Sequence, residues 1–411
     1  MSTSMTILKR AVLAVVFLSS TGTAAAFQQE ADAPGLEWLG EGRGQALAPP
    51  ASFNSADVAQ ELRRAEMDRI GSLPVSCHGR RQQGVLYHVR RLAIGDVAYA
   101  EAYALNDAGL VVGYTSAGDG IPTRPTVWAG AGRYDLGTPA GVAGTAYGIG
   151  DSGAVVGRVR VVGPQTGFAP VLWYRGSRWI LRSPDPANPE PVTVAVAINR
   201  HGTIIGNHNT AATDDNRAVI WRRGVPRFLP SLASSGFANA INDAGLVVGS
   251  SEYPGGVFYQ HAVLWRPDGR VVDLGTIGGS DSRAFDINNK GKIVGISTLA
   301  DDAGAVPAVW YRGRVIGLPV PSGMAGAARA INERDQIVGY QINGPVTTRR
   351  AMTWYGSTGY RLDTLLDDES RGIVINDAQD INDRGQILAT SILANGIPQP
   401  LLLTPRPCYR R

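Results

Sequence analysis

The sequence has few of the features that mark several large protein classes. Its 411 residues contain two cysteines, too few for a disulfide-dense scaffold or a cysteine-rich zinc site. No apolar run is long enough to span a bilayer, so no transmembrane segment is predicted. Charged residues make up 18% of the chain and the net charge is +4. Because the arginines are scattered among acidic residues, we expect no nucleic-acid partner.

Local catalytic motifs are also missing. There is no Gly-x-Ser-x-Gly, no His-Glu-x-x-His and no phosphate-binding Gly-x-x-x-x-Gly-Lys, so the sequence predicts no catalytic residue, no metal site and no cofactor. An enzyme that collects its acids from separate parts of a repeat fold would leave no such motif. A polysaccharide hydrolase or lyase therefore stays open as the alternative function.

The chain contains a repeat instead. Its pattern is clearest at 238–249, Ala-Asn-Ala-Ile-Asn-Asp-Ala-Gly-Leu-Val-Val-Gly. Similar segments lie at 102–113, 146–157, 195–206, 284–295, 328–339 and 378–389, which makes seven copies. Their last positions are 43 to 50 residues apart, long enough for four short strands and their turns.

One repeat can be interpreted strand by strand over 238–274. A first strand at 239–241 enters the turn Asn-Asp-Ala-Gly, whose residues tolerate positive φ. A second strand covers 246–248, a third covers 261–265, and the turn Pro-Asp-Gly at 267–269 leads to a fourth at 271–274. The β-branched and aromatic content of these runs predicts a four-stranded antiparallel meander.

The third strand of the repeat carries a tryptophan in six copies, with Leu403 at that place in the seventh. The six are Trp128, Trp173, Trp221, Trp265, Trp310 and Trp354. A single sheet of this size cannot bury both of its faces, so neighbouring sheets must stack in a ring. The sequence predicts an all-β fold, a seven-bladed β-propeller of four-stranded antiparallel blades. We interpret the tryptophans as core between blades, in preference to a ladder that stacks on sugars.

The two ends of the repeat region predict how the ring closes. The seventh copy lacks a fourth strand, while an extra strand at 85–92 precedes the first copy. We expect this N-terminal strand to complete the last blade and so remove an exposed sheet edge. Cys77 and Cys408 lie just outside these two segments and are predicted to form a disulfide across the closure. A metal site or a reactive thiol are the alternatives.

The N-terminal region differs in composition from the repeats. Residues 1–26 form a predicted signal peptide, with Lys9 and Arg10 before the apolar run 11–18 and three alanines at 24–26. Residues 27–54 are predicted to be a disordered linker. Residues 55–83 are predicted to hold a helix, with Ser55 as its N-cap, and a connection that packs on the ring. The propeller then occupies 84–411, and the protein is expected to be exported, either extracellular or periplasmic.

Several segments resemble the HAF-repeat family of extracellular bacterial proteins. They are His-Ala-Val-Leu-Trp at 261–265, Asp-Leu-Gly-Thr-Ile-Gly-Gly-Ser at 273–280, Ala-Phe-Asp-Ile-Asn at 284–288 and Lys-Ile-Val-Gly at 292–295. The resemblance covers residues 85 to 405. The family's His-Ala-Phe is His-Ala-Val here in one copy, and Arg217 and Arg350 replace the histidine elsewhere. The resemblance implies a secreted repeat protein and carries over no catalytic residue.

The meander topology predicts where a ligand would bind. Both short turns of each repeat share one face of the ring, while the long, variable loops share the other, and variable loops on a rigid scaffold are common binding sites. The candidate ligand-binding residues are His208, Asp214, Asp215, Glu252, Tyr253, Phe258, Tyr259 and His261. The alternative is that Phe258 and Tyr259 are buried and that the two aspartates form a solvated turn.

The repeated Asn-Asp-x-Gly turns are predicted to be structural. Four residues supply too few oxygens for calcium, and Gly150, Arg200 and Glu333 break the pattern. The sequence therefore favours a monomeric, exported binding or interaction module that engages a carbohydrate, peptide or envelope protein through its long-loop face.

Overall fold

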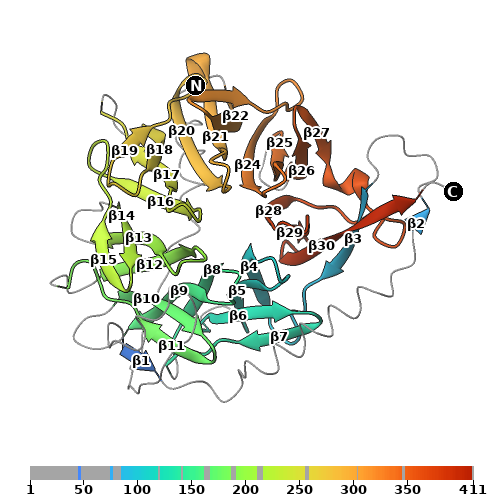
Figure 1. Ribbon diagram of the computed structural model, residues 1–411. Helices are drawn as coiled ribbons and strands as arrows, with labels where there is room; N and C mark the ends of the chain where they lie inside the picture. Colours follow the sequence, from blue (N-terminus) through green and yellow to red (C-terminus); the bar gives the residue numbers. More distant parts are fainter. Residues whose placement is uncertain are drawn as a thin grey trace.

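The structure is a computed structural model that describes residues 45–47, 75–76, 85–118, 121–139, 142–161, 167–186, 191–210, 216–254, 259–302, 304–344 and 348–409. Almost all of the described elements are β-strands, and they form a ring of sheets (Figure 1). The only described helices are two short 3-10 turns, η2 (Ala300–Asp302) and η4 (Leu362–Leu365). The prediction of an all-β propeller with four-stranded antiparallel blades is confirmed.

Five of the six sheets are single blades, and four of these have the predicted four strands. The first of these sheets contains β4 (Tyr99–Leu105), β5 (Val111–Ser116), β6 (Arg124–Ala129) and β7 (Gly132–Asp135). The second contains β16 (Gly236–Ile241), β17 (Val247–Glu252), β18 (Gln260–Trp265) and β19 (Val271–Asp273). The third contains β20 (Gly278–Ile287), β21 (Ile293–Leu299), β22 (Ala305–Tyr311) and β23 (Arg314–Gly317), and the fourth contains β24 (Ala325–Ile331), β25 (Gln336–Ile342), β26 (Arg350–Tyr355) and β27 (Thr358–Arg361). The strands predicted within 238–274 all appear, each within a few residues of its predicted bounds.

The sixth sheet has nine strands, so the number of separate sheets is six and not the expected seven. It contains two consecutive antiparallel meanders, β8 (Gly144–Ile149), β9 (Val155–Val161), β10 (Gly167–Tyr174), β11 (Ser177–Ile180) and then β12 (Pro191–Ile198), β13 (Ile204–Thr210), β14 (Asn216–Arg222), β15 (Val225–Phe228). A single parallel pair, Phe168 with Val192, joins β10 to β12. This short backbone bridge between repeats two and three merges their strands into one sheet.

Each repeat copy forms the hairpin of the two innermost strands, and the alanine that opens the copy pairs with the residue that ends it. Immediately after that alanine, every one of these hairpins has a β-bulge. The bulge brings the opposite backbone very close: a Cβ on Gly249 would lie 1.8 Å from the carbonyl oxygen of Phe237. Glycine ends six of the seven copies because there is no room for a side chain.

The tryptophans pack between sheets, as predicted. All six are at most 3% exposed, and each indole Nε1–H donates to a backbone carbonyl in the connection that enters its own sheet. The acceptors are Ala93 for Trp128, Gly137 for Trp173, Arg182 for Trp221, Pro230 for Trp265, Gly275 for Trp310 and Pro319 for Trp354. A buried indole needs such a partner, so each tryptophan both fills the core and fixes the connecting loop.

The N-terminal strand closes the ring at the predicted place. β3 (Val85–Arg91) pairs antiparallel with β30 (Pro398–Tyr409), in the sheet that also holds β28 (Asp377–Ile381) and β29 (Ile387–Ile392). His88 of β3 lies 3.0 Å from the Oδ2 atom of Asp367, and Arg406 of β30 lies 3.2 Å from the same oxygen. Charged contacts therefore add to the backbone pairing at the closure.

Two short strands lie within the N-terminal region. β1 (Gln45–Leu47), within the predicted linker 27–54, pairs with β11. β2 (Val75–Ser76) runs parallel to the end of β30 and places Val75 opposite Cys408. Cys77, the signal peptide and the helix predicted after Ser55 lie outside the described residues. In the described part of the chain, no helix is long and apolar enough to cross a membrane.

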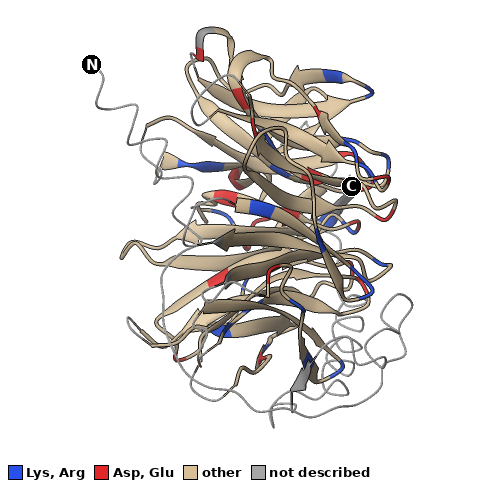
Figure 2. Ribbon diagram, turned by 90° about the vertical axis from the view of Figure 1, so that its left-hand side faces the viewer, with Lys and Arg blue, Asp and Glu red and all other residues tan. Residues whose placement is uncertain are grey.

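Charged residues are distributed over the blades and are not gathered on one element (Figure 2). This distribution agrees with the scattered charges of the sequence.

Candidate functional site

Hydrogen bonds link the turns at the ends of the innermost strands from one repeat to the next around the ring. In the turn at Asn242, the side-chain Oδ1 accepts from Leu246 N, and Nδ2 donates to the carbonyl of Asn288 in the next repeat. The same donation from one repeat to the next is made by Asn106, Asn199, Asn288, Asn332 and Asn382, the last of which reaches Asn106. These amides are used in joining repeats, which is the structural role predicted for the turns.

A second set of bonds runs beside the first. The N–H of Asp383 donates to Asp107 Oδ1 at 2.8 Å, and the N–H of Glu333 donates to Asp383 Oδ1 at 2.7 Å. Equivalent bonds lead from Asp107 to Asp151, from Arg200 to Asp243, from Asp243 to Asn289 and from Asn289 to Glu333. Between repeats two and three, Gly150 has no amide to donate and Arg200 has no acceptor to offer. Both kinds of side-chain joint are lost at that boundary.

These turns surround a cavity of about 240 Å³. Two aspartates from separate sheets, Asp286 and Asp380, help to line it. Asp286 accepts from Ile287 N and, across the repeat boundary, from Ile331 N at 2.8 Å. Asp380 does the same with Ile381 N and Leu105 N. Burial raises the pKa of Asp286 to about 6 and that of Asp380 to about 7, and the charge of Asp286 adds to the second shift.

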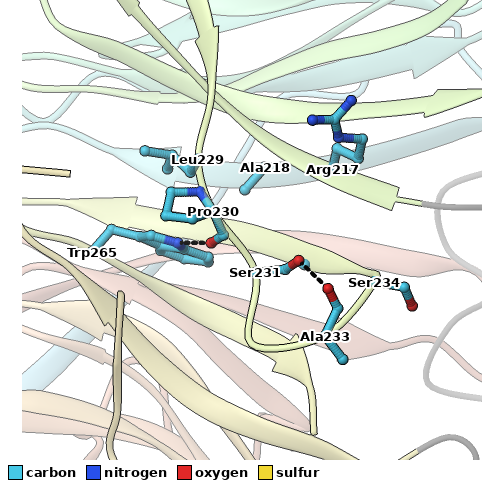
Figure 3. Close-up of a pocket in the computed structure, with 9 residues that line it drawn as sticks. Arg217, Ala218, Leu229, Pro230, Ser231, Ala233, Ser234 and Trp265 are labelled. Atoms are coloured by element: carbon cyan, nitrogen blue, oxygen red, sulfur yellow. Dashed lines mark hydrogen bonds between the residues drawn. The ribbon is translucent and has the colours of Figure 1, made fainter. Parts of the chain in front are cut away.

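A larger cavity, of about 430 Å³, opens on the long-loop face between repeats three and four (Figure 3). The connection from Leu229 to Gly236 forms one wall, and Trp265 forms the floor beside Pro230, whose carbonyl accepts from its indole at 2.5 Å. Arg217 stands at the opposite side, with its guanidinium 3.5 Å from the centre of the Phe228 ring. The lining combines hydroxyls, one guanidinium and apolar surface, which suits a polar small ligand.

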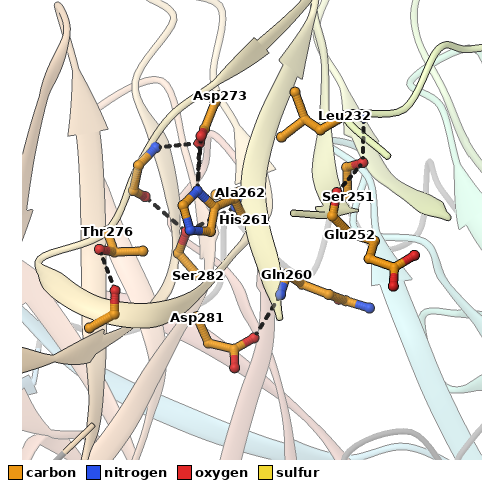
Figure 4. A network of polar contacts seen from close by, with 12 residues as sticks. Leu232, Ser251, Glu252, Gln260, His261, Ala262, Asp273, Thr276, Asp281 and Ser282 are labelled. Atoms are coloured by element: carbon orange, nitrogen blue, oxygen red, sulfur yellow. Dashed lines mark hydrogen bonds and ion pairs between the residues drawn. The ribbon is translucent and has the colours of Figure 1, made fainter. Parts of the chain in front are cut away.

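An aromatic pair lies on the same loop face, in the fourth repeat. The rings of Tyr253 and His261 stack with centroids 3.9 Å apart and planes 13° apart. Asp273 contacts the imidazole of His261, and its two carboxylate oxygens lie 2.9 and 3.0 Å from His261 Nδ1 (Figure 4). Tyr253 is 39% exposed. Tyr253 is thus a partly exposed residue whose ring is stacked on a histidine that a carboxylate holds in place.

Glu252 connects the aromatic pair to the cavity. It precedes Tyr253 at the end of β17, and its carboxylate accepts a hydrogen bond from the hydroxyl of Ser234, a residue of the cavity wall. Tyr259 takes part through its carbonyl, which accepts from Tyr253 N at 2.9 Å. The structure thus brings together four predicted residues, Glu252, Tyr253, Tyr259 and His261.

The other predicted residues do not join this cluster. His208 lies in strand β13 and not on a loop, and it is fully buried. Its Nδ1 is 2.8 Å from the hydroxyl of Thr193, its ring packs on Phe228, and burial lowers its pKa. The expectation of an exposed His208 is therefore wrong. Asp214, Asp215 and Phe258 lie outside the described residues.

Sequence reasoning missed the variable residues of the innermost strands. The residues just before and just after the alanine of each copy differ from repeat to repeat, unlike the turns. In the first repeat they are Glu101 and Tyr103, and the tyrosine hydroxyl donates to Glu101 Oε2 at 2.6 Å. In the sixth repeat the second position is Arg329, which donates to Asp377 of the last sheet. A comparison of the seven copies for their variable positions would have singled out these residues.

No protein-family model and no curated protein matches the sequence. Among solved structures, the chain is similar to an acylaminoacyl peptidase in complex with Z-Gly-Gly-Phe-chloromethyl ketone, at 13% identity and a TM-score of 0.50, over 75% of this chain and 52% of that chain. The fold is a propeller fold. The chain is also similar to the β-propeller domain of the Trilobed protease from Pyrococcus furiosus (10% identity, TM-score 0.47, 74% of this chain and 95% of that chain) and to the fucose-specific lectin from Aleuria aurantia (12%, 0.34, 74% and 91%). Identities this low show the fold alone, and the chain spans about half of the peptidase.

Proposed function

We propose that the protein is a ring-shaped binding module that engages a carbohydrate through its long-loop face. The observation that carries this proposal is the exposed residue Tyr253, which is stacked on His261 and follows Glu252, the residue bonded to Ser234 in the wall of the cavity next to Trp265. An aromatic face packs against the apolar face of a sugar ring, and neighbouring hydroxyl and carboxylate groups bind its hydroxyls. Ser234 and Glu252 are placed to supply such groups.

The support of the tyrosine favours binding over simple surface exposure. Because Asp273 fixes His261 and His261 fixes the Tyr253 ring, little side-chain freedom remains to be lost when a ligand binds. A peptide or an envelope protein could use the same surface, and these are the other ligands within this proposal.

The test is a binding screen of the purified protein against bacterial and plant glycans, with and without calcium. We expect a ligand whose binding is lost in Tyr253→Ala. The control is Ile316→Ala, which removes another large exposed side chain, 61% accessible, from the outer strand β23. If both variants bind the glycan as well as the unmodified protein does, the carbohydrate does not bind at this face.

A second candidate is a polysaccharide hydrolase or lyase that uses acids from separate blades. Asp286 and Asp380 are such a pair, in one cavity and with raised pKa values, which suits a general acid. They lie on the turn face, opposite the face predicted for function. Both oxygens of each already accept backbone N–H groups, so we rank binding first. Degradation of a bound glycan that is abolished by Asp380→Asn would reverse this order.

The proposal also covers the number of blades, the family, the export and the oligomeric state of the protein. We infer that the two meanders of the nine-stranded sheet act as two blades, so that seven repeats make seven blades. Membership of the HAF-repeat family, export after removal of residues 1–26 and a monomeric state belong to the proposal as well. Cell fractionation and determination of the mature N-terminus test the export.

A further inference from the structure

Two arginines and one aspartate meet at the boundary between the sixth repeat and the last sheet. Arg329 comes from the innermost strand β24, Asp377 begins β28, and Arg349 directly precedes β26. These strands are neighbours in the ring (Figure 1). The ring of Tyr340 from β25 lies under both guanidinium groups, 5.2 Å from that of Arg329 and 4.2 Å from that of Arg349.

The hydrogen bonds of this cluster are incomplete. Arg329 Nη2 and Arg349 Nη1 both donate to Asp377 Oδ2, at 3.3 and 3.0 Å. The other oxygen, Oδ1, is buried with no partner, and so is the Nε of each arginine. By contrast, Arg361 binds Asp363 with two nitrogens on two oxygens. Asp377 therefore contacts both arginines through one oxygen and leaves the other without a partner.

The cluster also carries more positive than negative charge. Two guanidiniums face one carboxylate, which leaves one positive charge in excess. The side chains are largely buried, with 32% exposure for Arg329, 20% for Arg349 and 13% for Asp377. Charge that is removed from water without a counter-charge is costly, so the site is suited to an anion that enters from solvent.

The fold does not require these charges. The position of Arg329 is occupied in the other repeats by Tyr103, Tyr147, Val196, Asn239, Phe285 and Gln379, and that of Asp377 by Glu101, Thr145, Val194, Phe237, Arg283 and Ala327. All of these repeats form the same bulged hairpin. Residues that vary on an invariant scaffold are free to serve a ligand.

We propose that Arg329 and Arg349 form a binding site for the carboxylate of a ligand such as a uronic acid. The carboxylate of the ligand accepts from the two guanidiniums, whose planar forks match it. The site is separate from the surface around Tyr253, so either one can fail without the other.

The experiment is a calorimetric titration of the purified protein with glucuronate, and with glucose as the neutral match. We expect glucuronate to bind and glucose not to bind. Arg349→Gln is expected to weaken glucuronate binding at least tenfold, and Arg349→Lys to give an intermediate affinity because it keeps the charge but loses the fork. The control Arg361→Gln, which breaks the complete pair with Asp363, is expected to bind as the unmodified protein does.

Circular dichroism and the unfolding midpoint confirm that each variant is folded. The site is refuted if glucuronate does not bind, if glucose binds equally, or if folded Arg349→Gln keeps full affinity.

Discussion

The glycine that ends a repeat copy gives the sharpest test of the fold. We consider Gly249→Ala in strand β17. The alanine Cβ would lie 1.8 Å from the carbonyl oxygen of Phe237, 2.9 Å from its carbonyl carbon and 3.1 Å from Ala238 Cα. All three atoms are backbone, so no side chain can turn away. Phe237 and Gly249 would have to separate by more than about 1 Å to reach ordinary van der Waals contact.

That separation opens the bulge between β16 and β17, whose pairs lie on both sides of Gly249. Overpacking in a core costs about 1 to 3 kcal/mol when side chains can adjust. Because only backbone can move here, we expect the free energy of unfolding to fall by about 3 kcal/mol or more.

The assay is urea unfolding followed by tryptophan fluorescence, with midpoint and slope compared. The seventh copy supplies a matched control, because Ala389 occupies the equivalent position and pairs with Ala378 beside the corresponding bulge of β28 and β29. Ala389→Gly should cost about 0.5 to 1 kcal/mol, the usual loss for glycine in a strand. A Gly249→Ala protein within about 1 kcal/mol of the unmodified one would refute the steric explanation of the repeat.

Three further predictions concern pH, the tryptophans and the cysteines. Since the folded pKa values of Asp286 and Asp380 are raised to about 6 and about 7, the folded state holds protons more tightly than the unfolded one, and the free energy of unfolding should fall as pH rises from about 4 to about 7. Their double replacement by asparagine should flatten this slope in urea unfolding at several pH values, and an unchanged slope would contradict it. Trp265→Phe removes an indole N–H bond and core volume, so we expect a loss of about 2 to 4 kcal/mol by the same method; a loss below about 1 kcal/mol would show that the bond is not needed. Cys77 and Cys408 should resist alkylation until a reductant is added, and mass spectrometry that finds both thiols free would exclude the disulfide.

Much of the fold was predictable because each repeat contains its own local signals. The Asn-Asp-Ala-Gly turn, the ending glycine and the buried tryptophan recur often enough to fix the strand order, and the unpaired segment at 85–92 indicated how the ring closes. The merger of repeats two and three was not predictable, because it depends on one backbone pair, Phe168 with Val192. No residue preference encodes such a contact.

The candidate site was predicted less well. Glu252, Tyr253, Tyr259 and His261 were found because aromatic and acidic residues gather on one loop. The position of His208 was predicted wrongly because strand β13 extends further than the sequence suggested. The alternation of side chains along this strand turns the His208 imidazole into the core. The Arg329 cluster was missed because its members are far apart in sequence and meet only when the last sheet closes against the sixth repeat.

The direction of the bonds between the Asn turns bears on how such a chain can evolve. Each asparagine amide donates to the repeat that follows, and the last one donates to the first. A tandem duplication of one repeat would therefore carry a complete joint with it, a donor for the next unit and an acceptor for the previous one. These hydrogen bonds do not themselves determine the number of repeats. That number is limited by the curvature of the ring and by strand β3, which must still reach β30.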